Sequence, residues 1–150
     1  MGRRREGREA AIQFLFARDL QGQTKPEDAD VFWTLHSAKA STRAFAENLI
    51  KGVLAHQEQI DSGITRLLEN FSFERLAAVD RNVLRVASFE LLYCPDVPTP
   101  VILNEAIDIA KALSAGESGS FVNGVLDKLA KSLRSPEPKK VENPISAADA

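Results

Sequence analysis

The first half of the chain places hydrophobic residues at helical spacing. An apolar stripe is formed by Ala11, Ile12, Leu15 and Phe16. This spacing predicts a helix over about residues 5–20 that ends at Gly22. Arg4 and Arg8 continue the same side towards the N-terminus, so we expect the first turns to extend beyond the core.

Further apolar segments follow this helix. The polar residues 23–30 predict a loop, and the apolar residues of 31–35 predict a short second helix. From Thr42 an apolar face continues for about 28 residues, which predicts one long helix that can break near Asp61.

Capping signals mark the helices of the second half. Asp80 is expected to be the N-cap of one helix, and Thr99 followed by Pro100 gives the next an N-cap with proline at its first position. Ser118 or Ser120 can cap the last helix. Each of these helices has an apolar stripe and polar residues on its other side.

The pattern therefore predicts an all-α fold of six or seven helices around one core, because no segment alternates with the period of a strand. Residues 1–134 form the predicted domain. Residues 135–150 carry three prolines and few large apolar side chains, so burial cannot offset the entropy of ordering them. We expect a disordered tail there.

Composition narrows the chemistry. The 150 residues, 44% hydrophobic and 27% charged, fit one globular domain. Cys94 is the single cysteine and has no intramolecular partner for a disulfide. His36 and His56 lack the spacing of metal ligands or of a catalytic triad. We expect no catalytic residue, metal or cofactor and, without a leader or a long apolar run, a cytoplasmic protein with no membrane contact.

The charge is unevenly distributed. The net charge is −2, yet residues 1–8 carry +3, so the remainder carries −5. Arginine stays charged and presents two donors to a phosphate, so a short arginine-rich segment suits an RNA backbone. A solvated terminus with no partner is the equally simple interpretation. Asp80 and Glu105 have simple helix-start interpretations as well, through capping and the helix dipole.

Several motifs together are more specific than any one of them. They are, in chain order, Arg4–Phe16 (RREGREAAIQFLF), Asp80–Leu91 (DRNVLRVASFEL), Val97-Pro98, Asn104–Ala106 (NEA) and Phe121–Asp127 (FVNGVLD). In this combination and order the chain resembles the NusB family of bacterial transcription antitermination factors. The resemblance covers about residues 3–134.

The resemblance implies two packed helical subdomains and no enzymatic activity. Its implied partners are the boxA segment of ribosomal RNA transcripts, the small-subunit ribosomal protein NusE and the RNA polymerase antitermination complex; a homodimer stays open. The implied RNA-binding residues are Arg4, Arg5, Arg8 and Phe121. The implied partner-binding residues, facing NusE, are Asp80 and Glu117.

Three positions depart from the usual family pattern. Ser120 stands where lysine or arginine is usual, Phe16 where tyrosine is common, and Gly7 where alanine is common. Because Ser120 lacks the positive charge of the usual lysine or arginine, we expect weaker phosphate binding at this position. The chain is too short for the methyltransferase domain to which NusB-like domains are sometimes fused, which favours a free-standing adaptor.

Two other functions compete with an RNA-binding adaptor. One is a helical protein-interaction module whose basic arm is incidental. The other is an RNA-processing enzyme, which would need a general base or a nucleophile that the sequence does not present. Binding to short single-stranded RNA separates the first two hypotheses.

Overall fold

The computed structural model describes residues 2–22, 26–70, 72–114 and 118–134. In these residues it contains seven α-helices, one 3-10 turn and no strand, which confirms the all-α prediction. The helices are α1 (Arg3–Gln21), α2 (Pro26–Leu35), α3 (Ala40–Ala55), α4 (Gln57–Thr65), α5 (Ala78–Tyr93), α6 (Thr99–Leu113) and α7 (Ser118–Leu133), with η1 (Phe73–Arg75) between α4 and α5.

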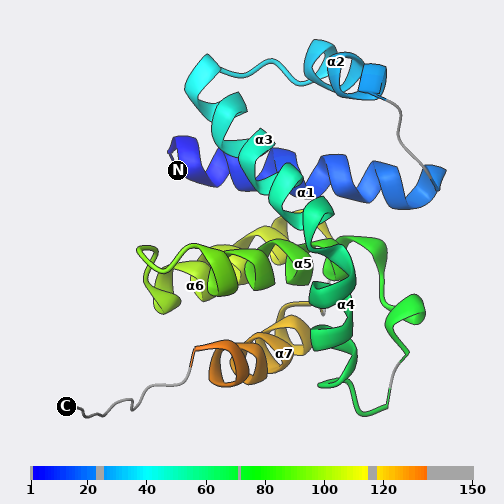
Figure 1. The fold of residues 1–150 in the computed structure, drawn as a ribbon, viewed down its shortest axis with the longest axis vertical. Coiled ribbons are helices and arrows are strands. Elements are labelled where there is room, and N and C mark those ends of the chain that lie inside the picture. The colour runs from blue at the N-terminus through cyan, green and yellow to red at the C-terminus, as the bar shows by residue number, and fades with distance from the viewer. Residues whose placement is uncertain (1, 23–25, 71, 115–117, 135–150) are drawn as a thin grey trace.

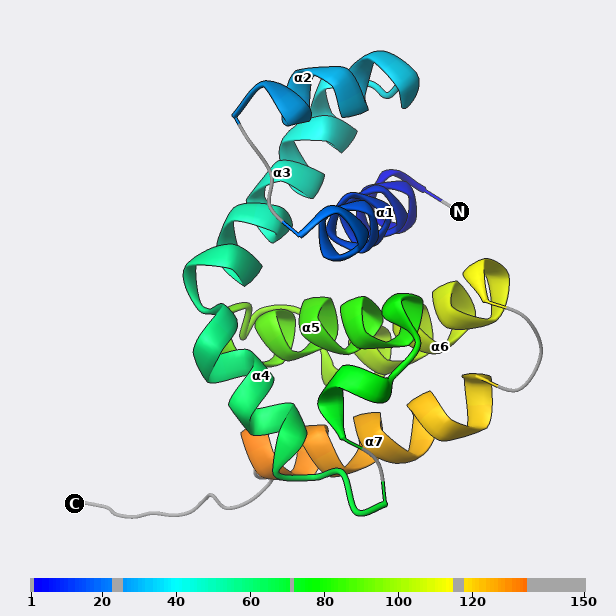
Figure 2. The ribbon, with the colours of Figure 1, turned by 90° about the vertical axis from the view of Figure 1, so that its right-hand side faces the viewer.

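The helices form two packed groups (Figures 1 and 2). α1, α2 and α3 lie on one side of the molecule, and α4 to α7 form the other group. α1 packs against α3 and rests on α5, while α7 lies across the layer of α5 and α6 from α1. The prediction of two helical subdomains is therefore confirmed.

α5 is the central helix of the fold. It packs against α1, α3, α4, α6 and α7, and every residue from Asn82 to Leu91 is buried. A Cβ on Gly52 of α3 would overlap the ring of Phe89, so glycine is what lets these two helices approach closely. Because α5 is surrounded, the charged residues on it must find partners inside the fold.

Arg134 ties the end of α7 to the end of α5. Its guanidinium donates to the carbonyl oxygens of Glu90, Leu91, Cys94 and Val97 at 2.7–3.1 Å. The last carbonyls of a helix have no partner within that helix. A single arginine therefore supplies donors at the carboxyl end of α5 and holds the segment leading into α6.

One predicted helix boundary is confirmed and two differ from the structure. The first helix ends before Gly22 as predicted, with that glycine at a φ of 91°. The second helix begins at Pro26 and not at residue 31, because proline suits the first turn of a helix. The long helix breaks at His56 and not near Asp61, so it is two helices.

The predicted caps were wrong by a few residues. α5 begins at Ala78, which puts Asp80 in the first turn of the helix and not at the N-cap. α6 begins at Thr99 with Pro98 in the cap position, and α7 begins at Ser118, which puts Ser120 inside it. The tail predicted over 135–150 lies outside the described residues.

Candidate nucleic-acid interface

The N-terminal turns of α1 expose two arginines. Arg3 donates a hydrogen bond from Nη1 to Ser41 Oγ at 3.1 Å. Arg4 lies over the ring of Phe45, with its Cζ 5.6 Å from the ring centre. Both arginines are exposed, and neither has a carboxylate partner among the described ion pairs. These two guanidinium groups are accessible to an anion from solvent.

Arg5 is held by two acids of α6. Its Nε and Nη2 donate to the two carboxylate oxygens of Glu105, both at 2.7 Å, and Nη2 also donates to Asp108 at 3.0 Å. The hydrogen bonds from Arg5, together with the charges of Arg5 and Arg8, outweigh burial and hold the pKa of Glu105 below its usual value. Glu105 lies in the second turn of α6, so its predicted role at the helix start was wrong.

Arg8 is buried. It donates from Nε and Nη2 to both oxygens of Glu90 at 2.8 and 2.7 Å, and the two side chains are only 4% and 2% exposed. Burial opposes the charge, but the hydrogen bonds and charge of Glu90 prevail and raise the pKa of Arg8. The expectation that the first turns extend beyond the core is therefore wrong at this residue, because α1 crosses α5 here.

Phe45 of α3 links the exposed and buried arginines. Its ring lies under Arg4 and under Arg8, 5.5 Å from the latter's Cζ. A Cβ on Gly7 would come within 2.5 Å of Cδ2 of this ring. Gly7 thus makes room for the phenylalanine that both cations contact.

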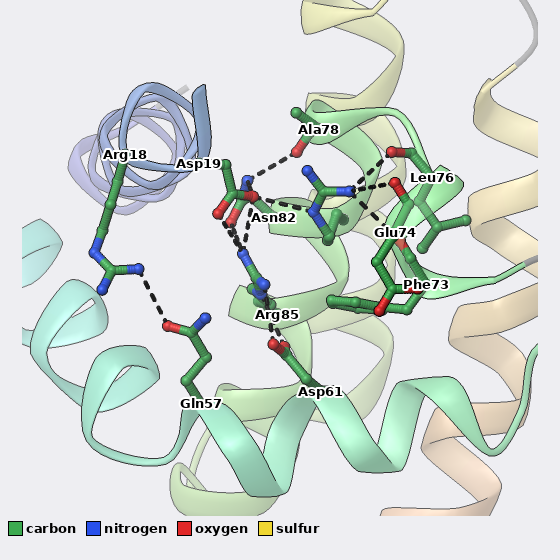
Figure 3. Close-up of polar contacts among 11 residues, drawn as sticks. Arg18, Asp19, Gln57, Asp61, Phe73, Glu74, Leu76, Ala78, Asn82 and Arg85 are labelled. Atoms are coloured by element: carbon green, nitrogen blue, oxygen red, sulfur yellow. Dashed lines mark hydrogen bonds and ion pairs between the residues drawn. The ribbon is translucent and has the colours of Figure 1, made fainter. Parts of the chain in front are cut away.

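A second polar cluster occupies the other end of α1 (Figure 3). Asp19 accepts hydrogen bonds from Arg81, Asn82 and Arg85 of α5 at 2.9–3.0 Å. Arg85 also reaches Asp61 of α4, with two bonds of 2.8 and 2.9 Å. One carboxylate thus joins the two helical groups.

Burial and hydrogen bonding compete at Asp19. Burial alone would raise its pKa, but the bond from Asn82 and the charge of Arg85 hold the pKa below its usual value. Arg81 extends the cluster by donating to the carbonyl oxygen of Leu76 at 3.0 Å, and Arg85 lies over the ring of Phe73. This cluster fixes η1 and the start of α5.

Of the two acids predicted to face a partner, the structure describes Asp80 alone. Asp80 is buried, with 7% of its surface exposed in the free chain. Glu117 lies outside the described residues.

Phe121 is separated from the arginines by a layer of helices. It is partly buried on α7 and lines a hollow together with Leu67, Leu68 and Lys128. α1 lies on the far side of the α5–α6 layer (Figure 2). α7, the helix that carries Phe121, therefore lies across this layer from α1.

The remaining candidates show no site chemistry. Tyr93 donates to Gln59 and stacks on His56, and burial raises the pKa of the Cys94 thiol. Over the described ranges no cluster of histidine, cysteine and acidic residues could hold a metal ion. No helix among the described residues is long and apolar enough to cross a membrane.

Sequence reasoning missed the acids that pair with the arginines. Glu90, Glu105 and Asp19 were not assigned to any cluster, because their partners lie 62 to 100 residues away in the chain. A signal did exist within α5. Arg85 and Glu90 are the two charged residues in a mostly apolar run, and buried charges require partners.

Comparison with known proteins places the chain in one family. The model of the NusB family matches residues 5–131. The chain is 44% identical over 133 residues to the transcription antitermination protein NusB of Sorangium cellulosum, which covers 89% of this chain and 95% of that protein.

Solved structures agree with the sequence match. A structure of NusB from T. maritima superposes with a TM-score of 0.77 at 37% identity, covering 87% of this chain and 92% of that one. A crystal structure of the antitermination factors NusB and NusE in complex with dsRNA gives 0.78 at 30% identity, covering 88% and 99%. The chain belongs to the NusB family.

Proposed function

We propose that this protein is a non-enzymatic, RNA-binding transcription antitermination factor that acts in the cytoplasm. It binds the boxA segment of ribosomal RNA transcripts together with the ribosomal protein NusE, and the pair modifies elongation by RNA polymerase. The observation that carries the proposal is the arginine cluster at the N-terminal end of α1, where Arg3 and Arg4 are exposed on a chain of net charge −2.

The proposed contact is electrostatic and positional. Arginine donors bind phosphate oxygens and release the cations that surround the RNA backbone, so affinity falls as salt rises. Arg3 and Arg4, which are exposed, are the first direct contacts in this proposal, and Arg5 joins them. Arg8 supports them from inside the fold, because its guanidinium is bound to the buried Glu90 and lies over the same Phe45 ring as Arg4. Phe121 is the proposed contact on α7.

The protein partner is proposed to bind at the start of α5 and the segment before α7. Asp80 and Glu117 are the acids assigned to it, and a basic ribosomal protein would be attracted by the negative charge of residues 9–150. The solved complex of the related NusB with NusE and dsRNA supports NusE as the partner. A homodimer in the absence of partners stays part of the proposal.

The test is a fluorescence-anisotropy titration with labelled single-stranded boxA RNA. A scrambled RNA of the same length and a duplex of the same sequence are compared, with and without NusE. We expect boxA RNA to bind more tightly than scrambled RNA. NusE should increase this difference, because a partner that binds together with boxA raises the affinity of the protein for that RNA. Equal binding of boxA and scrambled RNA, unaffected by NusE, would favour the interaction module with an incidental basic arm.

A further inference from the structure

We infer that Glu105 and Asp108 set the RNA affinity of this protein by competing with phosphate for Arg5. The inference rests on the proposed function and adds a regulating pair of acids to the same site. The two acids lie on α6 and bind Arg5 of α1 across about one hundred residues of sequence.

The donors of Arg5 are largely occupied. In the described part of the chain its hydrogen bonds are donated by Nε and Nη2. These two nitrogens form an edge of the guanidinium that can donate to two oxygens of one carboxylate or phosphate. Glu105 takes this edge with both of its oxygens at 2.7 Å. A phosphate that seeks the same two-point contact must displace a carboxylate.

The local charge also opposes an anion. Arg5 lies in a group of two cations and three anions, because Glu105 also lies 3.6 Å from Nη1 of Arg8 in the Arg8–Glu90 pair. By contrast, Arg3 contacts a serine hydroxyl and Arg4 a phenyl ring. Phosphate therefore meets Arg3 and Arg4 first, and Arg5 can offer it the two-point Nε–Nη2 contact only by exchanging partners.

The exposed fraction of each ion pair indicates whether a phosphate can replace its carboxylate. Arg5 and Glu105 are 24% and 23% exposed, and Asp108 is 55% exposed, so water and a phosphate can reach them. The Arg8–Glu90 pair has the same geometry but is almost fully buried. A partly exposed ion pair is weak enough to be displaced, while a buried one is not.

The experiment measures RNA affinity and its salt dependence for Glu105→Gln. We expect the variant to bind boxA RNA about two- to fivefold more tightly at low salt, the range that an exposed ion pair is worth. The slope of log affinity against log salt should steepen by up to about 0.7, the value for one phosphate contact on a single strand. In the wild type, a phosphate that binds Arg5 displaces carboxylates, which take up cations. This uptake cancels part of the release of cations from the RNA.

Two controls locate the effect. Asp127→Asn removes the same charge from an exposed acid of α7, away from Arg5, and should change affinity far less. In an Arg5→Ala background, Glu105→Gln should no longer steepen the slope, because no guanidinium is freed. Asp108→Asn, which leaves the two-point Glu105 contact in place, should give a smaller gain and serves if the Glu105 variant does not fold.

The outcomes separate the inference from the proposed function. Weaker binding by Glu105→Gln would mean that Glu105 positions Arg5, and it would overturn the inference. A gain equal to that of Asp127→Asn would overturn it too, since the effect would be general charge. Failure of the wild type to prefer boxA RNA would instead contradict the proposed function.

Discussion

The two ends of α1 use the same chemistry for different purposes. At each end, charged side chains of α1 meet partners from the α4–α7 group. At the N-terminal end exposure increases from Arg8 through Arg5 to Arg3 and Arg4. At the other end Asp19 is enclosed by Arg81, Asn82 and Arg85 (Figure 3). One end is open to an anion, and the other is closed by the protein itself.

This difference shows that burial, more than residue type, separates binding arginines from structural ones. Arg8 and Arg85 both form two-point contacts with carboxylates and are buried, so their donors are used within the fold. A buried ion pair contributes little net stability compared with apolar packing, but losing one partner is costly. Removing single charges at each end of α1 therefore tests whether burial separates the two kinds of arginine.

The largest effect is expected from breaking the buried pair of Arg8. Arg8→Met should lower the free energy of unfolding by about 3–5 kcal/mol, because Glu90 is left buried without its counter-charge. Urea unfolding followed by circular dichroism measures this. The double variant Arg8→Met, Glu90→Leu should recover most of the loss, and a single variant as stable as the wild type would show that the pair is not buried in solution.

Removing the carboxylate at the other end comes next. Asp19→Asn should cost about 3 kcal/mol, because Arg81 and Arg85 lose a shared partner inside the fold. Its effect should depend on pH. The pKa of Asp19 is lowered from 3.8 in the folded state, so its contribution is complete above 3.8 and is lost as the pH falls through the folded value.

Urea midpoints measured from neutral pH to below 3.8 check this dependence. The gap between wild type and Asp19→Asn should narrow in acid, as the wild-type carboxylate becomes neutral. A gap of constant size would assign the loss to packing and not to charge.

A smaller loss is expected where α3 meets α5. Gly52→Ala should cost about 1–3 kcal/mol, since the new methyl group would overlap the ring of Phe89 and force the helices apart. Gly63 offers a matched control on α4, because a Cβ there meets nothing within 4 Å. Thermal unfolding of both variants measures the difference, and equal melting temperatures would contradict the close approach.

The smallest effect on stability is expected from the exposed arginines. Arg3→Ala with Arg4→Ala should change the free energy of unfolding by less than about 0.5 kcal/mol, as is usual for surface substitutions. The same urea titration measures it. A loss comparable to that of Arg8→Met would make this end of α1 structural as well.

Sequence patterns predicted the helices well and the polar pairings poorly. The apolar stripe of α1 and the stop at Gly22 depend on nearby residues, so they could be predicted. The break at His56 and the start of α5 at Ala78 depend on packing between helices, and the boundaries were missed. The arginine-rich end was found from composition, but the division between Arg4 and Arg8 follows from where α1 crosses α5 and α3.

The central claim is that the exposed arginines at the N-terminal end of α1 bind RNA. Its most direct test is the salt dependence of boxA RNA binding by the wild type, by Arg3→Ala with Arg4→Ala, and by the exposed control pair Arg66→Ala with Arg75→Ala. We predict that the α1 variant binds more weakly, with a slope shallower by about 1.4, the value for two phosphate contacts on a single strand, and that the control keeps the wild-type slope. A wild-type slope in the α1 variant would contradict the claim and leave these arginines as a solvated helix end.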